Sequence, residues 1–235
     1  MKQSHRITII LAESALETIP ITIRGHPSVQ ASVRRKKKKV DHILLDNSLH
    51  HDAMRNLPEQ NKRGRPDIVH ICLLLATGSP LYRIDQLKII VHTINNQLVI
   101  VNPTRQWRPP KNYNRFCGLM EQLFSSEKKE IPEKGVPLLS LDKMSLNQLL
   151  ERIGGTILLF TEKGELDPQL HQIKYLFNEG AQSTVTLVIG GYPHGQFSPD
   201  ILKMVDHRVS IAKYPLEAWT VVSRGIYTLE QYLLS

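Results

Sequence analysis

The sequence predicts an α/β protein built on a parallel, doubly wound sheet. Apolar, β-branched runs alternate with segments whose apolar residues recur at helical spacing, which is typical of such folds. One run, Thr186–Ile189, ends abruptly in Gly190-Gly191-Tyr192-Pro193-His194-Gly195. Buried parallel strands are continuous apolar runs, and open α/β sheets bind ligands at the carboxyl ends of their strands. The sequence therefore predicts a ligand-binding loop at residues 190–195.

The composition indicates a sizeable core and a polyanionic partner. Hydrophobic residues make up 41% of the 235 positions, and the formal net charge is +8. No apolar run reaches the roughly 18 residues of a membrane span, so we expect no membrane partner. We also expect no export signal, and therefore reduced thiols at Cys72 and Cys117. The charge favours a nucleic acid, although a protein can be basic without binding one.

The amino-terminal segment begins with a predicted strand at Arg6–Ala12, and Ser14–Ile19 is typical of the start of a helix. The six consecutive cations of Arg34–Lys39 repel one another, so an exposed loop or helix face is expected there. Phosphate contact and a nuclear address are the alternative roles for this run. The His50-His51-Asp52 triplet has no partner at ligand spacing, so we expect no metal site.

A buried helix is predicted from Pro66, because proline suits the first turn of a helix and Asp67 suits its amino end. Asp67 is then either a helix-end carboxylate paired with Arg65, or it acts with Arg65 to hold a base and a phosphate at the end of the helix. The physical pattern leaves both roles open.

Residues 87–94 and 97–101 predict a hairpin that turns at Asn95-Asn96. In the next segment, Asn102–Phe116, four cations are interleaved with three aromatic residues, Trp107, Tyr113 and Phe116. Rings that stack on bases, set among charges that bind phosphates, suit looped RNA. We therefore favour RNA contact, with some of the aromatics still serving packing, over an irregular loop with all its aromatics buried. We expect a helix from Gly118 onward.

The carboxy-terminal half alternates most regularly. After a polar connector at 125–135, we expect helices at 145–153, 168–177, 198–204 and from 214, with strands at 156–160, 186–189 and 208–212. Gly225 within the last helix indicates close backbone packing. The loops after Phe160, Ile189 and Ala212 would share one sheet edge and form a small-molecule cleft. None has the glycine spacing of a dinucleotide or nucleoside triphosphate site.

Four separated motifs resemble a single family. They are the Gly190–Gly195 loop, the Tyr214-Pro215-Leu216 turn, Arg65-Pro66-Asp67 and Asn102-Pro103. Together, and in this order, they are similar to the small-subunit ribosomal RNA methyltransferases that methylate N1 of pseudouridine. This family is a ribosome-biogenesis branch of the SPOUT class, and the resemblance covers nearly the whole chain.

The resemblance implies one SPOUT-type α/β domain over residues 1–235, with a parallel sheet and a carboxy-terminal trefoil knot at roughly 155–235. It also implies an inserted basic RNA-binding extension at roughly 26–118 and a homodimer. The knot loops would hold S-adenosylmethionine, largely through backbone groups. The matching positions are Thr161, Gly190, Gly195, Ile211, Ala212, Lys213, Tyr214, Pro215 and Leu216.

For RNA, the arginines of the family match Arg65, Arg108 and Arg115, and Lys111 stands at the intermediate position. Lysine keeps the charge but lacks the bidentate fork, so a phosphate contact is retained better than base recognition. Asp67 matches a carboxylate near the target base. We assign it the catalytic position, where it would hold the base and assist loss of its proton.

The implied function is S-adenosylmethionine-dependent methylation of N1 of a pseudouridine in small-subunit rRNA during ribosome biogenesis. Other ribosome assembly factors or ribosomal proteins are further expected partners. The expected location is the cytoplasm, or the nucleolus of a eukaryote. The alternatives are a non-catalytic RNA-binding assembly factor, a SPOUT methyltransferase with another RNA target, and an α/β enzyme that binds no RNA.

Overall fold

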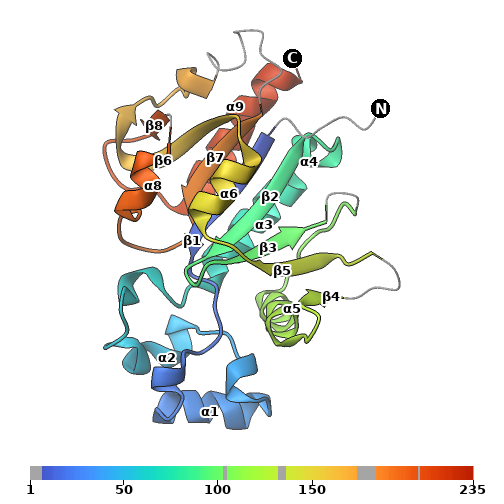
Figure 1. Ribbon diagram of the computed structural model, residues 1–235, viewed down its shortest axis with the longest axis vertical. Coiled ribbons are helices and arrows are strands. Elements are labelled where there is room, and N and C mark those ends of the chain that lie inside the picture. The colour runs from blue at the N-terminus through green and yellow to red at the C-terminus, as the bar shows by residue number, and fades with distance from the viewer. Residues whose placement is uncertain (1–6, 103–104, 132–135, 174–183, 206, 235) are drawn as a thin grey trace.

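The computed structural model describes residues 7–102, 105–131, 136–173, 184–205 and 207–234. Its strands are β1 (Ile7–Ser14), β2 (Leu87–Thr93), β3 (Gln97–Val101), β4 (Glu130–Ile131), β5 (Leu139–Lys143), β6 (Thr156–Leu166), β7 (Val185–Gly190) and β8 (His207–Ser210). Its α-helices are α1 (Pro27–Lys36), α2 (Asn47–Met54), α3 (Pro66–Gly78), α4 (Pro80–Arg83), α5 (Tyr113–Ser125), α6 (Leu146–Ile153), α8 (Pro199–Lys203) and α9 (Ala218–Leu233). Figure 1 shows their arrangement.

The strands form one sheet in the order β4-β5-β3-β2-β1-β7-β6-β8. β1 lies in the interior of the sheet with all eight residues buried, and it pairs in parallel with β2 and β7. β6 and β8 extend the parallel part beyond β7. The predicted hairpin at residues 87–101 is confirmed, because β3 pairs antiparallel with β2. β5 and β4 also pair antiparallel, so the expected parallel arrangement is wrong at this edge of the sheet. The short turn at Asn95-Asn96 reverses the chain, and a direct reversal produces an antiparallel pair.

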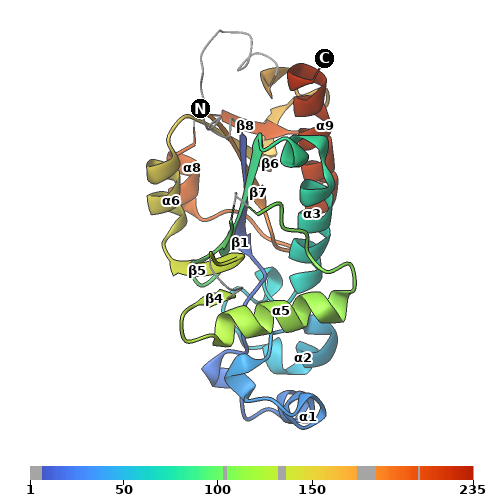
Figure 2. The ribbon, with the colours of Figure 1, turned by 90° about the vertical axis from the view of Figure 1, so that its right-hand side faces the viewer.

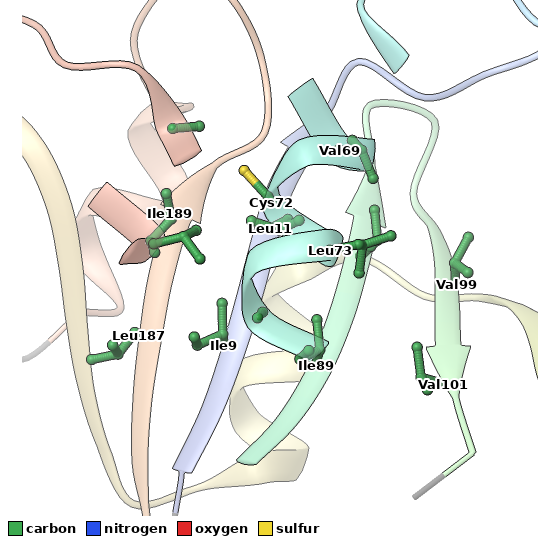
Figure 3. Close-up of a cluster of buried hydrophobic side chains, with 14 of the residues drawn as sticks. Ile9, Leu11, Val69, Cys72, Leu73, Ile89, Val99, Val101, Leu187 and Ile189 are labelled. Atoms are coloured by element: carbon green, nitrogen blue, oxygen red, sulfur yellow. The ribbon is translucent and has the colours of Figure 1, made fainter. Parts of the chain in front are cut away.

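Helices cover both faces of this sheet (Figure 2). α3 packs against α9 on one face, and α6 contacts α8 on the other. Successive residues of β1 serve the two cores alternately, as strand geometry requires. Ile9 and Leu11 belong to the core beneath α3 and α9 (Figure 3), whereas Ile10 and Ala12 belong to the core beneath α6.

The close packing predicted at Gly225 is confirmed. A Cβ atom there would lie 3.3 Å from Cδ1 of Leu187 on β7 and 3.8 Å from the ring of Phe160 on β6. α9 therefore rests directly on the two strands whose carboxyl ends lead to the predicted ligand loops. No helix in the described part of the chain combines the length and apolar character needed to cross a membrane.

The helix predicted at Ser14–Ile19 is wrong. β1 continues to Ser14, and the next residues run beside residues 43–45. The N–H of Ile19 donates to the carbonyl of Ile43 at 2.9 Å, and the N–H of Leu45 donates to the carbonyl of Glu17 at 2.9 Å. Pairing with a distant segment outweighs local helix propensity here. α1 and α2 pack over a separate small core that includes Ile19 and Ile43.

Stacking of Trp107 and Phe116 on RNA bases is contradicted by their burial, whereas RNA contact by the charged residues of this segment stays a prediction. α5 begins at Tyr113, ahead of the expected start, because the Asn112 side chain caps it by accepting from the N–H of Arg115 at 3.1 Å. Phe116 is 0% exposed and Trp107 only 5%. The Tyr113 hydroxyl donates to Oδ2 of Asp46 at 2.7 Å. These rings hold the segment against the core.

Most of the carboxy-terminal elements match their predicted positions. The ends of α6, β7, α8 and β8 lie within two residues of the expected ranges. β6 extends beyond its expected end to Leu166, and α9 begins at Ala218, later than expected. Of the helix predicted at 168–177, residues 174–177 lie outside the described residues. Its first three residues, 168–170, are not helical, and Leu170 has a left-handed φ of 54°, so the predicted start is wrong. Leu170 and Ile173 are buried in the main core.

We predict that Phe116→Ala lowers the free energy of unfolding by about 3–5 kcal/mol, because it removes a fully buried ring. Gln122→Ala, at an exposed position on the same helix, should change it by less than about 0.5 kcal/mol. Urea unfolding measures both. If Phe116→Ala left stability unchanged but weakened RNA binding, Phe116 would be a base-stacking residue after all.

Candidate functional site

A cavity of about 220 Å³ opens beside the middle of β6, the carboxyl end of β7 and the loop between β8 and α9. Eight of the nine positions expected to hold cofactor line it: Thr161, Gly190, Gly195, Ile211, Ala212, Tyr214, Pro215 and Leu216. The ninth, Lys213, is exposed and does not belong to the wall. A lysine keeps its ammonium group in water unless it is paired. The three predicted loop regions therefore meet in one place.

The wall at Thr161 is an irregular stretch of strand, whereas a loop was expected. Phe160 and Glu165 both pair with Val209 of β8, so residues 161–164 bulge out of the ladder between them. A Cβ atom at Gly164 would lie 2.5 Å from the backbone of Val209. Glycine thus lets β6 and β8 approach each other closely while the bulge lines the cavity.

The Gly190–Gly195 loop is fixed to the end of β1 by its backbone. The N–H of Gly191 donates to the carbonyl of Ala12, and the N–H of Ala15 donates to the carbonyl of Gly191, each at 2.8 Å. A Cβ atom at Gly191 would lie 2.1 Å from Oγ of Ser14, which is itself fully buried. Only glycine fits at this contact.

A buried ion pair lies behind the same loop. Nζ of Lys62 is 2.7 Å from Oε2 of Glu13, and the two residues are 7% and 9% exposed. Oε1 of Glu13 accepts from the N–H of Ser198 at 3.2 Å. Lys62 Nζ also lies 5.1 Å from the centroid of the Tyr192 ring, in the cavity wall. The pair therefore supports the wall from outside the cavity.

The pattern of the sequence does not predict this pair. Lys62 and Glu13 stand 49 positions apart, and such a separation leaves no periodic signal. The only hint was the apolar run of β1 ending at a carboxylate. Glu13 also has a φ of 48°, a left-handed conformation that is uncommon for a residue other than glycine.

Tyr192 contributes a neutral phenol to the cavity. Burial raises its pKa above the ordinary value, and the carboxylates of Glu13, Glu162 and Glu59 raise it further. A phenol that keeps its proton can donate one hydrogen bond to a ligand. His194, in contrast, is exposed, and its N–H donates to the carbonyl of Asn61 at 3.3 Å. Through that bond the loop contacts the segment that leads into α3.

Asp67 and Arg65 form a bidentate ion pair at the amino end of α3. Nε and Nη2 of Arg65 donate to the two oxygens of Asp67 at 2.8 and 2.7 Å, with about a third of each side chain exposed. The hydrogen bond to Asp67 raises the pKa of Arg65, and Glu217 adds to this effect. Glu217 directly precedes α9, so the pair lies where the amino ends of α3 and α9 meet. Neither residue lines the cavity itself.

The other predicted RNA-binding residues, Arg108, Lys111 and Arg115, are all exposed. Besides the bond from Tyr113 to Asp46, two further hydrogen bonds hold their segment against the body of the protein. A ring nitrogen of His70 lies 2.7 Å from the carbonyl of Pro110, and the Tyr82 hydroxyl donates to the carbonyl of Trp107 at 2.9 Å. His70 follows Asp67 by three residues, so the two side chains lie on the same face of α3. The structure thus brings this segment close to the Arg65–Asp67 pair, while the RNA contacts themselves stay predictions.

The His50-His51-Asp52 triplet separates as expected for neighbours on a helix. His50 is fully buried; its ring accepts from the N–H of Asp46 at 3.1 Å and lies 3.0 Å from Oγ of Ser32. Asp52 instead pairs with Arg55 at the surface. Both have structural partners, and no group of three or more potential ligands gathers within the described ranges.

We predict opposite effects for two glycine substitutions. Gly191→Ala should lower the free energy of unfolding by about 1–3 kcal/mol, because its methyl group overlaps Ser14. In Gly118→Ala, in α5, the new methyl meets nothing within 4 Å, and the helix should gain about 0.5–1 kcal/mol. Urea unfolding measures both variants. A neutral Gly191→Ala would mean that the contact between this loop and β1 is not tight.

Comparison with known proteins places the chain in a family. A family model described as EMG1/NEP1 methyltransferase matches residues 9–230. The chain is 42% identical to the ribosomal RNA small subunit methyltransferase Nep1 of Staphylothermus marinus, over 98% of this chain and 97% of that one. It is 41% identical to the Nep1 of Pyrococcus furiosus, over 96% of each. The crystal structure of Archaeoglobus fulgidus Nep1 bound to S-adenosylhomocysteine superposes with a TM-score of 0.83 at 37% identity, covering 97% of this chain and 99% of that one. The chain belongs to the EMG1/NEP1 methyltransferase family.

Proposed function

We propose that this protein transfers a methyl group from S-adenosylmethionine to N1 of a pseudouridine in small-subunit rRNA, as a step of ribosome biogenesis. One observation carries the proposal: a single cavity gathers eight of the nine positions expected to hold the cofactor. The names of the relatives, rRNA small subunit methyltransferases, support the RNA substrate. The S-adenosylhomocysteine in the A. fulgidus structure supports the methyl donor.

The residues of the cavity fit such a cofactor. Phe160, Ile189 and Leu216 give apolar surface for an adenine ring. Glu162 and Gln196 provide polar groups at the wall, where Nε2 of Gln196 donates to Oε1 of Glu162 at 2.6 Å. The glycines of the 190–195 loop let a ligand approach the backbone closely. The lining thus accommodates a ligand that has both an apolar ring and polar edges.

The reaction requires alignment more than a strong base. When bound, the cofactor would supply a methyl group bonded to a sulfonium sulfur. The ring nitrogen would form a bond to the methyl carbon while the sulfur leaves as a neutral thioether. Pseudouridine presents an N1–H that can be lost, whereas N1 of uridine is bonded to the sugar. Holding the methyl donor and the base in the correct geometry lowers the activation barrier by several kcal/mol, up to about 7–11 kcal/mol. The task of the protein is therefore to fix the base against the cavity.

Asp67 and the nearby cations are suited to that task. A carboxylate has about four acceptor positions. Arg65 occupies one on each oxygen of Asp67, which leaves others to accept from an N–H of the base. Arg65 and the exposed Arg108, Lys111 and Arg115 would bind phosphates around a target base that is splayed out of its loop. In this proposal Asp67 orients the base and assists departure of the N1 proton.

From the same resemblance we propose three further structural features. They are a trefoil knot within roughly 155–235, an RNA-binding extension at roughly 26–118 and a homodimer. We also propose a cytoplasmic location, or a nucleolar one in a eukaryote.

The test of function uses labelled S-adenosylmethionine and small-subunit rRNA hairpins that carry either uridine or pseudouridine at the target position. The proposal expects label only in the pseudouridine hairpin. Equal label in both would contradict it, and label in neither, with RNA still bound, would favour a non-catalytic assembly factor.

We predict that Asp67→Asn lowers kcat by about tenfold to a hundredfold, because the amide cannot accept the proton. The affinity for RNA should change by less than about threefold, since the phosphate-binding cations remain. Asp142→Asn removes an exposed carboxylate from β5 and is the matched control. Single-turnover methylation and RNA titration measure the two quantities. A wild-type rate for Asp67→Asn, with unchanged RNA affinity, would rule out the role of Asp67.

A further inference from the structure

The basic run Arg34–Lys39 is not used by the site described above, but the structure gives it a defined shape. Arg34, Arg35 and Lys36 form the last turn of α1. Lys37 ends the helix in a left-handed conformation with φ of 52°, and its N–H donates to the carbonyl of Val33 at 2.9 Å. Lys39 has φ and ψ of −63° and 145°, an extended backbone. The run is therefore a helix end followed by a turn.

One buried carboxylate holds two of the six cations. Glu121 of α5 is 2% exposed, and its oxygens lie 2.5 Å from Nζ of Lys36 and 2.7 Å from Nζ of Lys38. It also accepts from the N–H of Leu44 at 3.2 Å. Burial alone would raise the pKa of Glu121, but the hydrogen bonds from the two lysines outweigh it and lower the pKa. The carboxylate is thus a charged anchor for the basic run.

The other four cations of the run remain available. Arg34, Arg35, Lys37 and Lys39 are exposed, and none makes an ion pair with any residue that the structure describes. Because Glu121 holds Lys36 and Lys38, the positions of Lys37 and Lys39 are fixed between and beside anchored residues. A charge cluster held in place loses less conformational entropy when it binds than a free tail does.

This cluster adjoins the predicted RNA-binding strip. Glu121 and Arg115 are both on α5, six residues apart, which is about 9 Å along the helix axis and about 120° around it. Arg108 and Lys111 continue the strip from the amino end of α5. In both ribbon views α5 lies between the sheet and α1 (Figures 1 and 2). The basic end of α1 therefore extends the strip away from the methyl-transfer site.

We propose that Arg34, Arg35, Lys37 and Lys39 form a second phosphate-binding surface, which holds the rRNA that flanks the target loop. The inference rests on the proposed function, since it takes rRNA as the partner. Two observations favour RNA over an acidic protein. The cluster continues the strip of Arg108, Lys111 and Arg115, and the run of six residues has no aromatic or apolar side chain to anchor a protein interface.

The test measures how RNA affinity depends on salt. The variant R34Q/R35Q/K37Q/K39Q removes the four available charges and leaves the two anchored lysines in place. The control R83Q/K143Q/R152Q/K203Q removes four exposed cations from α4, β5, α6 and α8. Each phosphate contact contributes about 0.7–0.9 to the magnitude of the negative slope of log K against log salt concentration. Losing four contacts should therefore reduce that magnitude by roughly 3. Thermal unfolding verifies that both proteins are folded.

The ligand is a pseudouridine-containing small-subunit rRNA hairpin, used both with its flanking stem and as the bare loop. On the long RNA, the cluster variant should show the smaller slope and about tenfold to a hundredfold weaker binding at low salt. The control should bind as the wild type does. On the bare loop, all three proteins should bind alike, and methylation of that loop should proceed at the wild-type rate.

Three results would overturn the proposal. They are a wild-type slope for the cluster variant on the long RNA, an equal loss in the control, and an equal loss on the bare loop. A variant that loses binding to polyglutamate while its RNA slope stays normal would assign the surface to an acidic protein instead. Failure of the proposed function is separate, because the wild-type protein would then methylate neither RNA.

Discussion

The ion pair between Lys62 and Glu13 is the contact on which the arrangement of the site depends. It joins the end of the central strand β1, the segment that leads into α3, and the loop after β7. Breaking a buried ion pair from one side costs about 3–5 kcal/mol. Loss of Lys62 would leave the Glu13 carboxylate buried without its cation, whereas loss of Glu13 would leave Lys62 with the more exposed carboxylate of Glu59 at 3.2 Å. The left-handed φ of Glu13 costs roughly 1–2 kcal/mol more. The ion pair offsets this backbone strain and fixes the positions of the three segments relative to one another.

The two halves of the proposed reaction are held by this same contact. On one side, Lys62 lies over the Tyr192 ring of the cavity wall, and the N–H of His194 donates to the carbonyl of Asn61. On the other side, Arg65 follows Lys62 by three residues and pairs with Asp67. The wall that would hold the methyl donor and the pair that would hold the target base are thus parts of one backbone connection. Their relative orientation, the quantity that governs methyl transfer, is set by β1 and its carboxylate.

The features that could be predicted from the sequence are those with local signals. The apolar runs of β1 and β7, the hairpin at residues 87–101 and the glycines of the 190–195 loop all have recognisable patterns. The cavity followed from them, since the carboxyl ends of parallel strands share a sheet edge. The features that failed depend on distant partners. The Ser14–Ile19 segment pairs with residues 43–45, and Phe116 stacks on His70 at 4.5 Å between ring centroids. Neither partner is visible in the local pattern.

The most direct test of this account is a double-mutant cycle on cofactor affinity. Calorimetry would measure S-adenosylhomocysteine binding to the wild type, Lys62→Met, Glu13→Gln and the double variant, with Lys203→Met at an exposed site as control. The account predicts that each single variant weakens binding and that the double variant loses less than the sum, with a coupling of at least about 1 kcal/mol. Lys203→Met should bind as the wild type does. Wild-type affinity in Lys62→Met, or losses that simply add, would contradict the claim that this pair positions the cofactor wall.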